Sequence, residues 1–343
     1  MLKFNNKAEV LSFLSPKENS EVVPLKSIRI KITDRCHWNC WWCHNEGTGA
    51  RNPKITKDIE FKGEFSEKFL NLCNSLEINE VHITGGEPTT YNGLVDSIKF
   101  LKKHGFTVKM TSVGNSEEII NKVIKSGIDG INFSLHAIET EELHSTQIDR
   151  SLKWTKIQQD RQFNSIFAAK EAGVKVKLNT VMASHKDISR IKEVIDWSFK
   201  HDIDMRILHE VNLLEESVNA VRELLDSYGA VEKRRKYIYG ASSGTIFYDI
   251  PGKREIGFKI LLPQFLDSMC NSCELKKNDT CGEYFYGIRL ENKLDEHNVR
   301  LCVHRTNENT YMGMEQFINS NHFNEIRKKQ LEYKEQHKME VQV

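Results

Sequence analysis

The sequence of 343 residues has no apolar run that approaches the ~20 residues required by a membrane-spanning helix. It begins MLKFNNKAEVLSFL, which mixes polar and apolar residues and lacks a small-residue cleavage site, so it does not resemble a secretory signal. Neither sign of charge is in excess, because 49 Lys and Arg oppose 48 Asp and Glu. Nothing therefore indicates a general binder of nucleic acid or of acidic surfaces. Internal repeats and low-complexity tracts are also absent, and we expect a cytoplasmic protein with no membrane partner.

The sequence does contain a regular alternation of strand and helix patterns between Lys26 and Leu208. Short apolar segments predict strands, and segments with apolar residues three and four positions apart predict helices. The predicted strands are 27–33, 80–84, 106–111, 130–135, 174–182 and 204–208. The predicted helices are 66–76, 93–104, 116–126, 164–172 and 188–201. This alternation is typical of an α/β protein with a parallel sheet, either open or curled into a partial (β/α)6 barrel of the TIM type.

The rhythm changes after residue 210. A helix is expected at 213–229, hairpins around 244–262 and 285–303, and a charged helix at about 314–337. The hairpins are expected to carry the late cysteines. We expect three regions: an N-terminal extension (1–25), the partial barrel (26–210) and a smaller α+β region at the end of the barrel (211–343).

The eight cysteines are clustered, apart from Cys73 on the apolar face of a predicted helix, where we expect it to be buried. Clustered cysteines in a cytosolic protein more often bind metal or perform chemistry than form disulfides. The first group is Cys36, Cys40 and Cys43, and the second is Cys270, Cys273, Cys281 and Cys302.

The first group has the spacing Cys-x3-Cys-x2-Cys in one short loop. Three thiolates can hold three corners of a cluster of four irons and four sulfurs, which leaves one iron open to a small molecule. Zinc is the alternative, with His37 or His44 as a fourth ligand, although structural zinc sites usually combine two separated pairs.

Polar residues also follow the other predicted strands, and the carboxyl ends of barrel strands are where such folds place their chemistry. For any single one of these residues, strand capping or packing is the alternative explanation. They are Thr84-Gly85-Gly86-Glu87-Pro88, Thr111-Ser112, Ser134, His136, Asn179, Thr180 and Arg206.

The cysteine loop and the Gly-Gly-Glu-Pro segment together resemble the radical S-adenosylmethionine (SAM) superfamily. The resemblance implies a [4Fe-4S] cluster whose open iron binds the amino and carboxylate groups of SAM, and a 5′-deoxyadenosyl radical that takes hydrogen from a substrate. It also implies a flavodoxin- or ferredoxin-type electron donor. By resemblance, Gly85, Gly86 and Glu87 support the methionine amino group, Trp42 lies near adenine, and Ser112, Ser134 and Arg206 hold ribose and carboxylate.

Within the superfamily, residues 26–305 resemble the MoaA family, the GTP-cyclising enzymes of molybdenum cofactor synthesis. SIRIKITDRC, HITGGEPTTYNGLVDSI and VKVKLNTVM carry this similarity. The late cysteines resemble a second-cluster extension of the twitch or SPASM type, which implies a second [4Fe-4S] cluster. Four thiolates could saturate all four irons, whereas three would leave one iron open if Cys281 is a bystander. Zinc again remains the alternative, because four cysteines suit a tetrahedral ion.

The chain departs from the MoaA pattern where that family places basic residues before Gly-Gly-Glu-Pro, because Glu80 and His82 stand there. An Arg-x-Arg pair is reduced to Arg289, while Arg29 and Lys177 match substrate-side positions. We therefore expect a radical SAM enzyme, an oxidoreductase or a lyase or cyclase, that acts on a small molecule such as a nucleotide or sugar. The alternatives are a peptide-modifying maturase, a GTP 3′,8-cyclase and a non-enzymatic zinc protein.

Two weaker signals remain. His82, His136 and His304 could exchange protons, although a structural role is the commoner one for such residues. The aromatic run Tyr284-Phe285-Tyr286 could line a substrate cavity, although aromatics in a hairpin more often serve packing.

Overall fold

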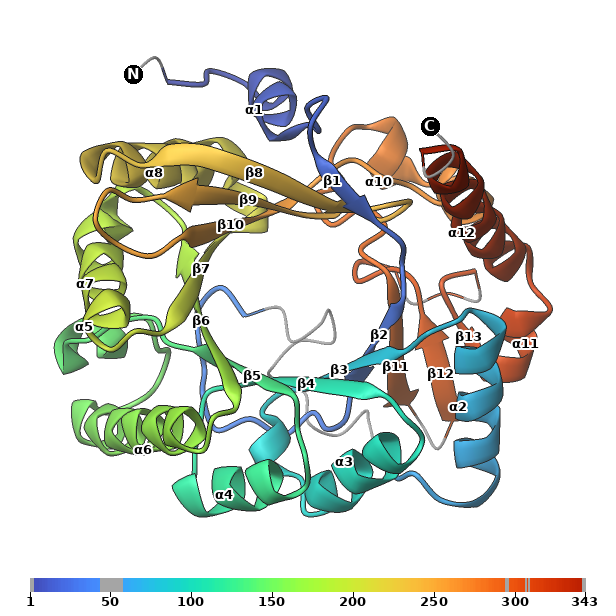
Figure 1. Ribbon diagram of the computed structural model, residues 1–343, viewed down its shortest axis with the longest axis horizontal. Coiled ribbons are helices and arrows are strands. Elements are labelled where there is room, and N and C mark those ends of the chain that lie inside the picture. The colour runs from blue at the N-terminus through green and yellow to red at the C-terminus, as the bar shows by residue number, and fades with distance from the viewer. Residues whose placement is uncertain (1–2, 44–57, 294–295, 306, 308, 341–343) are drawn as a thin grey trace.

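The computed structural model describes residues 3–43, 58–293, 296–305, 307 and 309–340. It confirms the predicted α/β class, because six strands run parallel and neighbour one another in chain order (Figure 1). Each lies within two residues of its predicted range. The strands are β2 (Ser27–Lys31), β3 (Glu80–Thr84), β4 (Thr107–Ser112), β5 (Gly130–Ser134), β6 (Lys175–Met182) and β7 (Asp204–His209).

Helices cover the outer side of these strands (Figure 1). α4 shows how the sequence forms one: the Ser116 side chain accepts a hydrogen bond from the Ile119 N–H, and Ile120 and Val123 are buried. Gly127, with φ of 88°, lies just beyond its end. The helices are α2 (Gly63–Ser75), α3 (Leu94–Lys103), α4 (Glu117–Lys125), α5 (Thr140–Ser145), α6 (Leu152–Glu171), α7 (Ile188–Lys200) and α8 (Leu214–Ser227).

Helix α6 begins twelve residues earlier than predicted. Its buried face carries Thr155, Gln158, Gln159, Gln162 and Ser165. Because these side chains are polar, the apolar spacing that predicts a helix is weak in its first half. Of these, Gln159 and Gln162 donate hydrogen bonds to backbone carbonyls near the ends of β4 and β5.

The strands of the C-terminal region extend the barrel sheet at both of its ends. β10 pairs in parallel with β7, and β11 pairs in parallel with β2. The late cysteines also lie outside the hairpin strands: three fall between the hairpins and Cys302 follows the second. The added strands are β8 (Val231–Ile238), β9 (Ser243–Asp249), β10 (Ile256–Leu261), β11 (Ile288–Lys293), β12 (Glu296–Arg300) and β13 (Tyr311–Gly313).

Both termini pack onto this sheet. Helix α1 (Lys7–Leu14) contacts α8, and β1 (Glu21–Val23) pairs with β8. Residues 24–26 then lead directly from β1 into β2, so the chain completes a ring of strands (Figure 1). The predicted final helix is divided into α11 (Met314–Ile318) and α12 (Asn321–Glu340). No helix among the described residues is both long and apolar enough to cross a membrane.

Successive side chains of each barrel strand point alternately to the apolar core and to the interior of the ring. Ile28 and Ile30 of β2 are fully buried in the main apolar core. Between them, Arg29 faces the interior and lies in register with His82 of β3, which in turn neighbours Lys109 of β4. The period of two in a strand therefore gives the ring an apolar outer layer and a polar lumen.

Candidate active site

The first cysteine loop follows β2 at the carboxyl ends of the barrel strands. Cys36 and Cys40 are partly buried, and Cys43 is exposed. Burial raises the pKa of the Cys40 thiol to about 12. Burial also raises the pKa of Cys36, and Glu87 and the other two sulfurs raise it further. The three sulfurs thus influence one another's pKa values. Their thiolate forms require a bound cation for stability, and iron would displace the thiol protons.

The arrangement of the thiols bears on the choice between zinc and a cluster. In the part of the chain that the structure describes, no three His, Cys, Asp or Glu side chains gather tightly enough to hold one metal ion. Zinc binds sulfur at about 2.3 Å, so its ligand atoms must lie within ~4 Å of one another. In a four-iron cluster each thiolate binds a different iron, so the ligand sulfurs need not approach one another as closely. His44, the alternative zinc ligand, lies outside the described residues.

Gly85 and Gly86 pack against the lead-in to the cysteine loop. The Gly86 N–H donates to the Thr33 carbonyl (2.8 Å), and the Glu87 N–H donates to the Arg35 carbonyl (2.7 Å). A Cβ on Gly85 would lie 2.5 Å from the Thr33 carbonyl oxygen, and one on Gly86 would lie 2.5 Å from that of Arg35. These glycines therefore permit the close contact that fixes the cysteine loop on the end of β3.

The Glu87 carboxylate joins the end of β3 to the end of β4. It is 1% exposed and accepts hydrogen bonds from the Ser112 hydroxyl (2.6 Å), the Val113 N–H (2.7 Å) and the Thr89 hydroxyl (2.6 Å). Burial raises the pKa of Glu87, and these hydrogen bonds oppose that effect. The Ser112 hydroxyl also accepts from the Gly114 N–H (2.9 Å), so it links Glu87 to the turn that follows β4.

Trp42 and Ser134, two predicted SAM-binding residues, lie at the same carboxyl mouth. The Trp42 ring centroid is 4.8 Å from that of His136. Burial, followed by the charge of Arg190, lowers the pKa of His136 to about 3, so this imidazole is neutral at physiological pH. The Ser134 carbonyl accepts a hydrogen bond from the Gln162 amide (2.8 Å), which fixes the end of β5 against α6.

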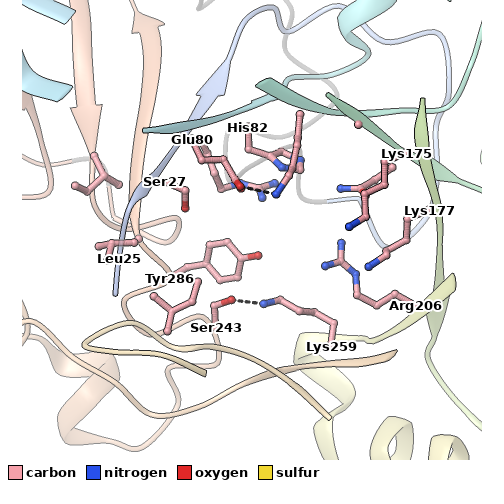
Figure 2. A pocket seen from close by; sticks show the side chains of 17 residues that line it. Leu25, Ser27, Glu80, His82, Lys175, Lys177, Arg206, Ser243, Lys259 and Tyr286 are labelled. Carbon is pink, nitrogen blue, oxygen red and sulfur yellow. Dashed lines mark hydrogen bonds and ion pairs between the residues drawn. The ribbon is translucent and has the colours of Figure 1, made fainter. Parts of the chain in front are cut away.

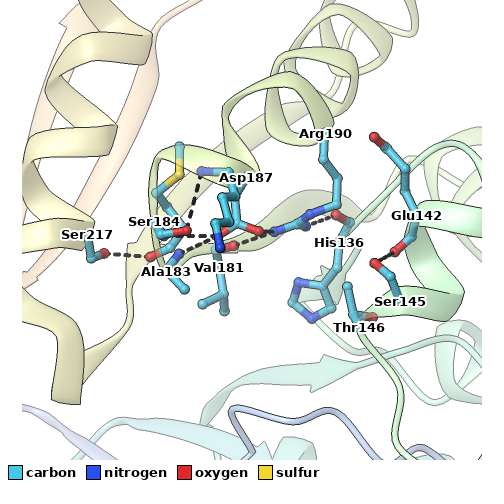
Figure 3. A network of polar contacts seen from close by, with 12 residues as sticks. His136, Glu142, Ser145, Thr146, Val181, Ala183, Ser184, Asp187, Arg190 and Ser217 are labelled. Carbon is cyan, nitrogen blue, oxygen red and sulfur yellow. Dashed lines mark hydrogen bonds and ion pairs between the residues drawn. The ribbon is translucent and has the colours of Figure 1, made fainter.

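Arg190, near the start of α7, ties the ends of two strands together (Figure 3). Its guanidinium donates to the carbonyls of His136 and Val181 and to the Asp187 carboxylate (2.7 Å). Asp187 in turn accepts from the Ala183 N–H (2.9 Å). This network fixes the spacing of the mouth between β5 and β6.

Two cavities meet inside the ring of strands. The lumen cavity, of about 240 Å³, lies toward the amino ends of the strands, where Glu80 and Lys175 line it (Figure 2). The mouth cavity, of about 210 Å³, lies at the carboxyl ends beside Trp42 and Leu208. The residues that line both are Arg29, Lys259 and Tyr286. A ligand that fills both cavities would therefore pass these three side chains.

The lumen cavity is strongly cationic. Its carboxylate, Glu80, forms an ion pair with Lys109. Burial, followed by the charge of Arg206, lowers the pKa of Lys177 to about 8, and burial lowers that of Lys259 to about 8. Neighbouring cations repel one another, and an anionic ligand would relieve this repulsion and so be stabilised here. The lining cations are Arg29, Lys109, Lys175, Lys177, Arg206 and Lys259.

Tyr286 stands between the two cavities. The cationic groups of Arg29, Lys259 and Arg289 lie 5.4, 5.3 and 5.0 Å from the centroid of its ring. Burial raises the pKa of the phenol, but the surrounding cations outweigh burial and lower the pKa to about 8. Tyr286 is thus a partly anionic group within a cationic lumen.

The predicted substrate residues line the two cavities, and one predicted SAM residue, Arg206, lines the lumen cavity with them. Arg29 and Lys177 line the lumen cavity, and Arg289 lines the mouth cavity. Arg206, predicted to bind SAM, lines the lumen cavity beside Lys177, and its Nε donates to Asn179 Oδ1 (3.1 Å). Arg206 therefore shares the lumen cavity with Arg29 and Lys177, two of the predicted substrate residues.

Cys270, Cys273 and Cys281 lie in or beside two short helices, α9 (Asp267–Cys270) and α10 (Glu274–Lys277). Cys270 and Cys273 are buried, and Cys281 and Cys302 are partly buried. The charges of Cys302, Cys281 and Cys273 each raise the pKa of Cys270, although burial is the larger cause. The four sulfurs therefore form a second electrostatic group.

Some residues of the site were not singled out by the sequence analysis. Lys109 and Lys175 line the lumen, and so does Lys259 of β10. The sequence signal for such residues is a lysine that stands between two buried apolar residues of a strand. Lys259 stands in this way between Phe258 and Ile260. Tyr286 was one of three aromatic candidates, of which Phe285 is in the core.

Comparisons with known proteins agree with this geometry. The radical SAM superfamily model matches residues 30–198. A probable GTP 3′,8-cyclase of Thermoplasma volcanium is 26% identical over 281 residues, which is 76% of this chain and 79% of the relative. A second, from Saccharolobus solfataricus, is 35% identical over 197 residues, or 55% of this chain and 59% of the relative.

Solved structures show the same fold. Streptococcus suis SuiB bound to S-adenosylmethionine has a TM-score of 0.56 at 14% identity, covering 89% of this chain and 68% of that one. Native anSMEcpe with bound AdoMet has a TM-score of 0.53 at 13% identity, covering 88% of this chain and 82% of that one. A [4Fe-4S] cluster and SAM are the cofactors that the family implies. The chain contains a radical SAM superfamily domain over residues 30–198, and it is an enzyme with probable GTP 3′,8-cyclases among its sequence relatives.

Proposed function

We propose that the protein cleaves SAM reductively and uses the resulting radical to remove hydrogen from a small anionic substrate held in the ring of strands. The observation that carries the proposal is the cationic lumen cavity, which meets a mouth cavity lined by Trp42. In this proposal, residues 26–210 form the SAM-cleaving barrel, and residues 211–343 form the second-cluster region.

We assign the cluster to Cys36, Cys40 and Cys43, which would leave one iron for SAM. Bound there, the cluster supplies one low-potential electron to the sulfonium of SAM. The protein holds the loop in place through the contact between Gly86 and Thr33. The Cys-x3-Cys-x2-Cys spacing supports a cluster rather than a zinc ion, because structural zinc sites usually combine two separated pairs of ligands.

We assign Trp42, Gly85, Gly86, Glu87, Ser112 and Ser134 to the SAM side of the site. Glu87 and Ser112 act as a buried pair that spaces β3 and β4. Arg206 is proposed as a substrate residue, because it shares the lumen cavity with Lys177.

The substrate is proposed to place its anionic group among Lys177, Arg206 and Lys259, and its reacting carbon in the mouth cavity. The mouth is more apolar, with Val181 and Leu208 in its lining. This division would orient the substrate, since a phosphate or carboxylate is stabilised at the cationic end and a less polar group at the other.

GTP 3′,8-cyclisation is a second candidate, because both sequence relatives described above carry that name. Arg29 and Lys177 support it, since they face the lumen. Glu80 and His82 line the same cavity where the MoaA family has basic residues, and a carboxylate beside a triphosphate would weaken binding. A smaller anion suits this lumen better.

The late cysteines are proposed to hold a second [4Fe-4S] cluster with all four sulfurs as ligands. Such a cluster would transfer electrons rather than bind substrate through iron. A flavodoxin- or ferredoxin-type protein is the proposed electron donor to the first cluster.

Metal analysis separates these proposals from a zinc protein. After anaerobic purification and reconstitution, the protein is expected to contain iron and acid-labile sulfide, and a variant with Cys36, Cys40 and Cys43 all replaced by Ala is expected to lose about half of both. Zinc without sulfide in the wild-type protein would overturn the proposal.

A further inference from the structure

The segment after α5 pairs with the cysteine loop as a short antiparallel strand would. Cys40 and Gln147 form a β-bridge. The Ile148 N–H donates to the Asn39 carbonyl (2.8 Å), and the Asn39 side-chain amide donates to the Ile148 carbonyl (2.9 Å). This pairing holds the middle of the cysteine loop, whereas the Gly86 and Glu87 contacts hold its lead-in at Thr33 and Arg35.

Gln147 extends from this segment toward the sulfur of Cys40. Its Oε1 accepts a hydrogen bond from the Asn39 N–H (3.0 Å), which only the carbonyl end of the amide can do. The amide nitrogen must therefore point the other way, where it lies 3.3 Å from Cys40 Sγ and 2.9 Å from Thr146 Oγ1. The backbone thus fixes which end of Gln147 faces the sulfur.

The surroundings of Cys40 make such a donor important. Cys40 packs against a small apolar cluster of Trp38, Ala137 and Leu143. In apolar surroundings a negative sulfur receives little stabilisation from solvent, so a fixed N–H donor has a larger electrostatic effect than it would in water.

We propose that Gln147 is a positioning residue that sets the reduction potential of the first cluster through its N–H···S hydrogen bond to Cys40. Reduction adds one electron from an external donor to the cluster and its thiolates, and a hydrogen bond to a ligand sulfur stabilises this more negative state. Gln147 therefore raises the potential and eases loading of the electron. The inference rests on the assignment of Cys40 as a cluster ligand.

The test compares two variants at Gln147 in the full-length reconstituted protein. Gln147→Met has a similar volume and removes the N–H donor, and Gln147→Glu keeps an oxygen for the Asn39 N–H but places a carboxylate near the sulfur. Gln330→Met is the matched control, because the Gln330 side-chain amide likewise donates two hydrogen bonds, to the carbonyls of Leu25 and Leu76, outside the cysteine loop. The midpoint potential is measured by titration of the electron paramagnetic resonance signal that SAM perturbs.

Both Gln147 variants are expected to retain iron and sulfide and to shift the midpoint potential to more negative values, while Gln330→Met keeps the wild-type potential. Wild-type potentials in both Gln147 variants would overturn the inference, as would loss of the cluster in both. Absence of iron and sulfide from the wild-type protein would instead contradict the cluster assignment itself.

Discussion

The guanidinium carbon of Arg289 lies 5.0 Å from the ring centroid of Tyr286, at the point where the lumen and mouth cavities meet. Arg289 is the remaining member of an Arg-x-Arg pattern, and Tyr286 precedes it by three positions. Both residues belong to the C-terminal region, and the cavities that they line are completed by Arg29 and Lys177 of the barrel strands. The proposed substrate site is therefore made by both regions of the chain.

Tyr286 is expected to ionise near pH 8. Lys259, Arg29, Arg206 and Arg289 stabilise the phenolate more than burial opposes it, so the folded-state pKa lies below the ordinary value. Phenolate absorbance in the ultraviolet, followed against pH, should show one tyrosine that titrates well before the others, and Tyr286→Phe should lack it. Lys259→Met should move this titration to higher pH, since it removes the largest stabilising charge. A Tyr286→Phe titration identical to that of the wild-type protein would refute the assignment.

Lys177→Met and Arg206→Met are expected to weaken substrate binding without loss of SAM cleavage in the absence of substrate. A hydrogen bond to a charged group contributes about 1.5–3 kcal/mol, which corresponds to a ~10- to 100-fold rise in KM. The measurement is KM for the substrate together with 5′-deoxyadenosine release without it. Lys253→Met is the control, because Lys253 pairs with Asp196 at the surface. Equal loss of SAM cleavage in the lumen variants would show that these residues serve SAM instead.

Ser112→Ala is expected to destabilise the fold. It removes the hydroxyl that donates to buried Glu87 and accepts from the Gly114 N–H. A buried hydrogen bond to a charged group contributes about 1.5–3 kcal/mol, so the free energy of unfolding should fall by about 2 kcal/mol. Ser145→Ala, which removes an exposed hydroxyl, should change it by less than about 0.5 kcal/mol. Denaturant unfolding measures both, and equal stabilities would contradict the role given to the Glu87–Ser112 pair.

Cys281→Ala tests whether the second site has four ligands. If Cys281 binds iron, the variant should lose iron and change the spectrum of the second cluster, while the signal perturbed by SAM remains. Cys73→Ala is the control, because Cys73 is fully buried in the apolar core, as predicted from the sequence. A second cluster in Cys281→Ala with its full iron content and an unchanged spectrum would show that the assignment of four ligands is wrong.

The barrel could be predicted from the sequence because its strands and helices carry strong periodic signals. β3 has its predicted bounds, and α7 differs by one residue at its end. These segments bury apolar residues at the spacing of their own secondary structure, so local pattern and final packing agree. The first half of α6 escaped prediction because Gln158, Gln159 and Gln162 face inward.

The lumen was only partly predictable. Arg29 and Lys177 were found through resemblance, whereas Lys259 depends on the pairing of β10 with β7, which brings a late strand beside the barrel. No local pattern specifies which distant strands become neighbours, so the cationic character of the cavity emerges only from the assembled sheet. The contact between Gln147 and Cys40 is of the same kind, since 107 positions separate the two residues.

Reductive cleavage of SAM is the most direct test of the central claim. Anaerobically reconstituted protein, given a strong reductant and SAM, is predicted to bind SAM and release 5′-deoxyadenosine and methionine, and replacement of Cys43 by Ala should abolish both. If the iron-loaded wild-type protein binds no SAM and releases neither product, with or without candidate anionic substrates, the proposed chemistry is wrong.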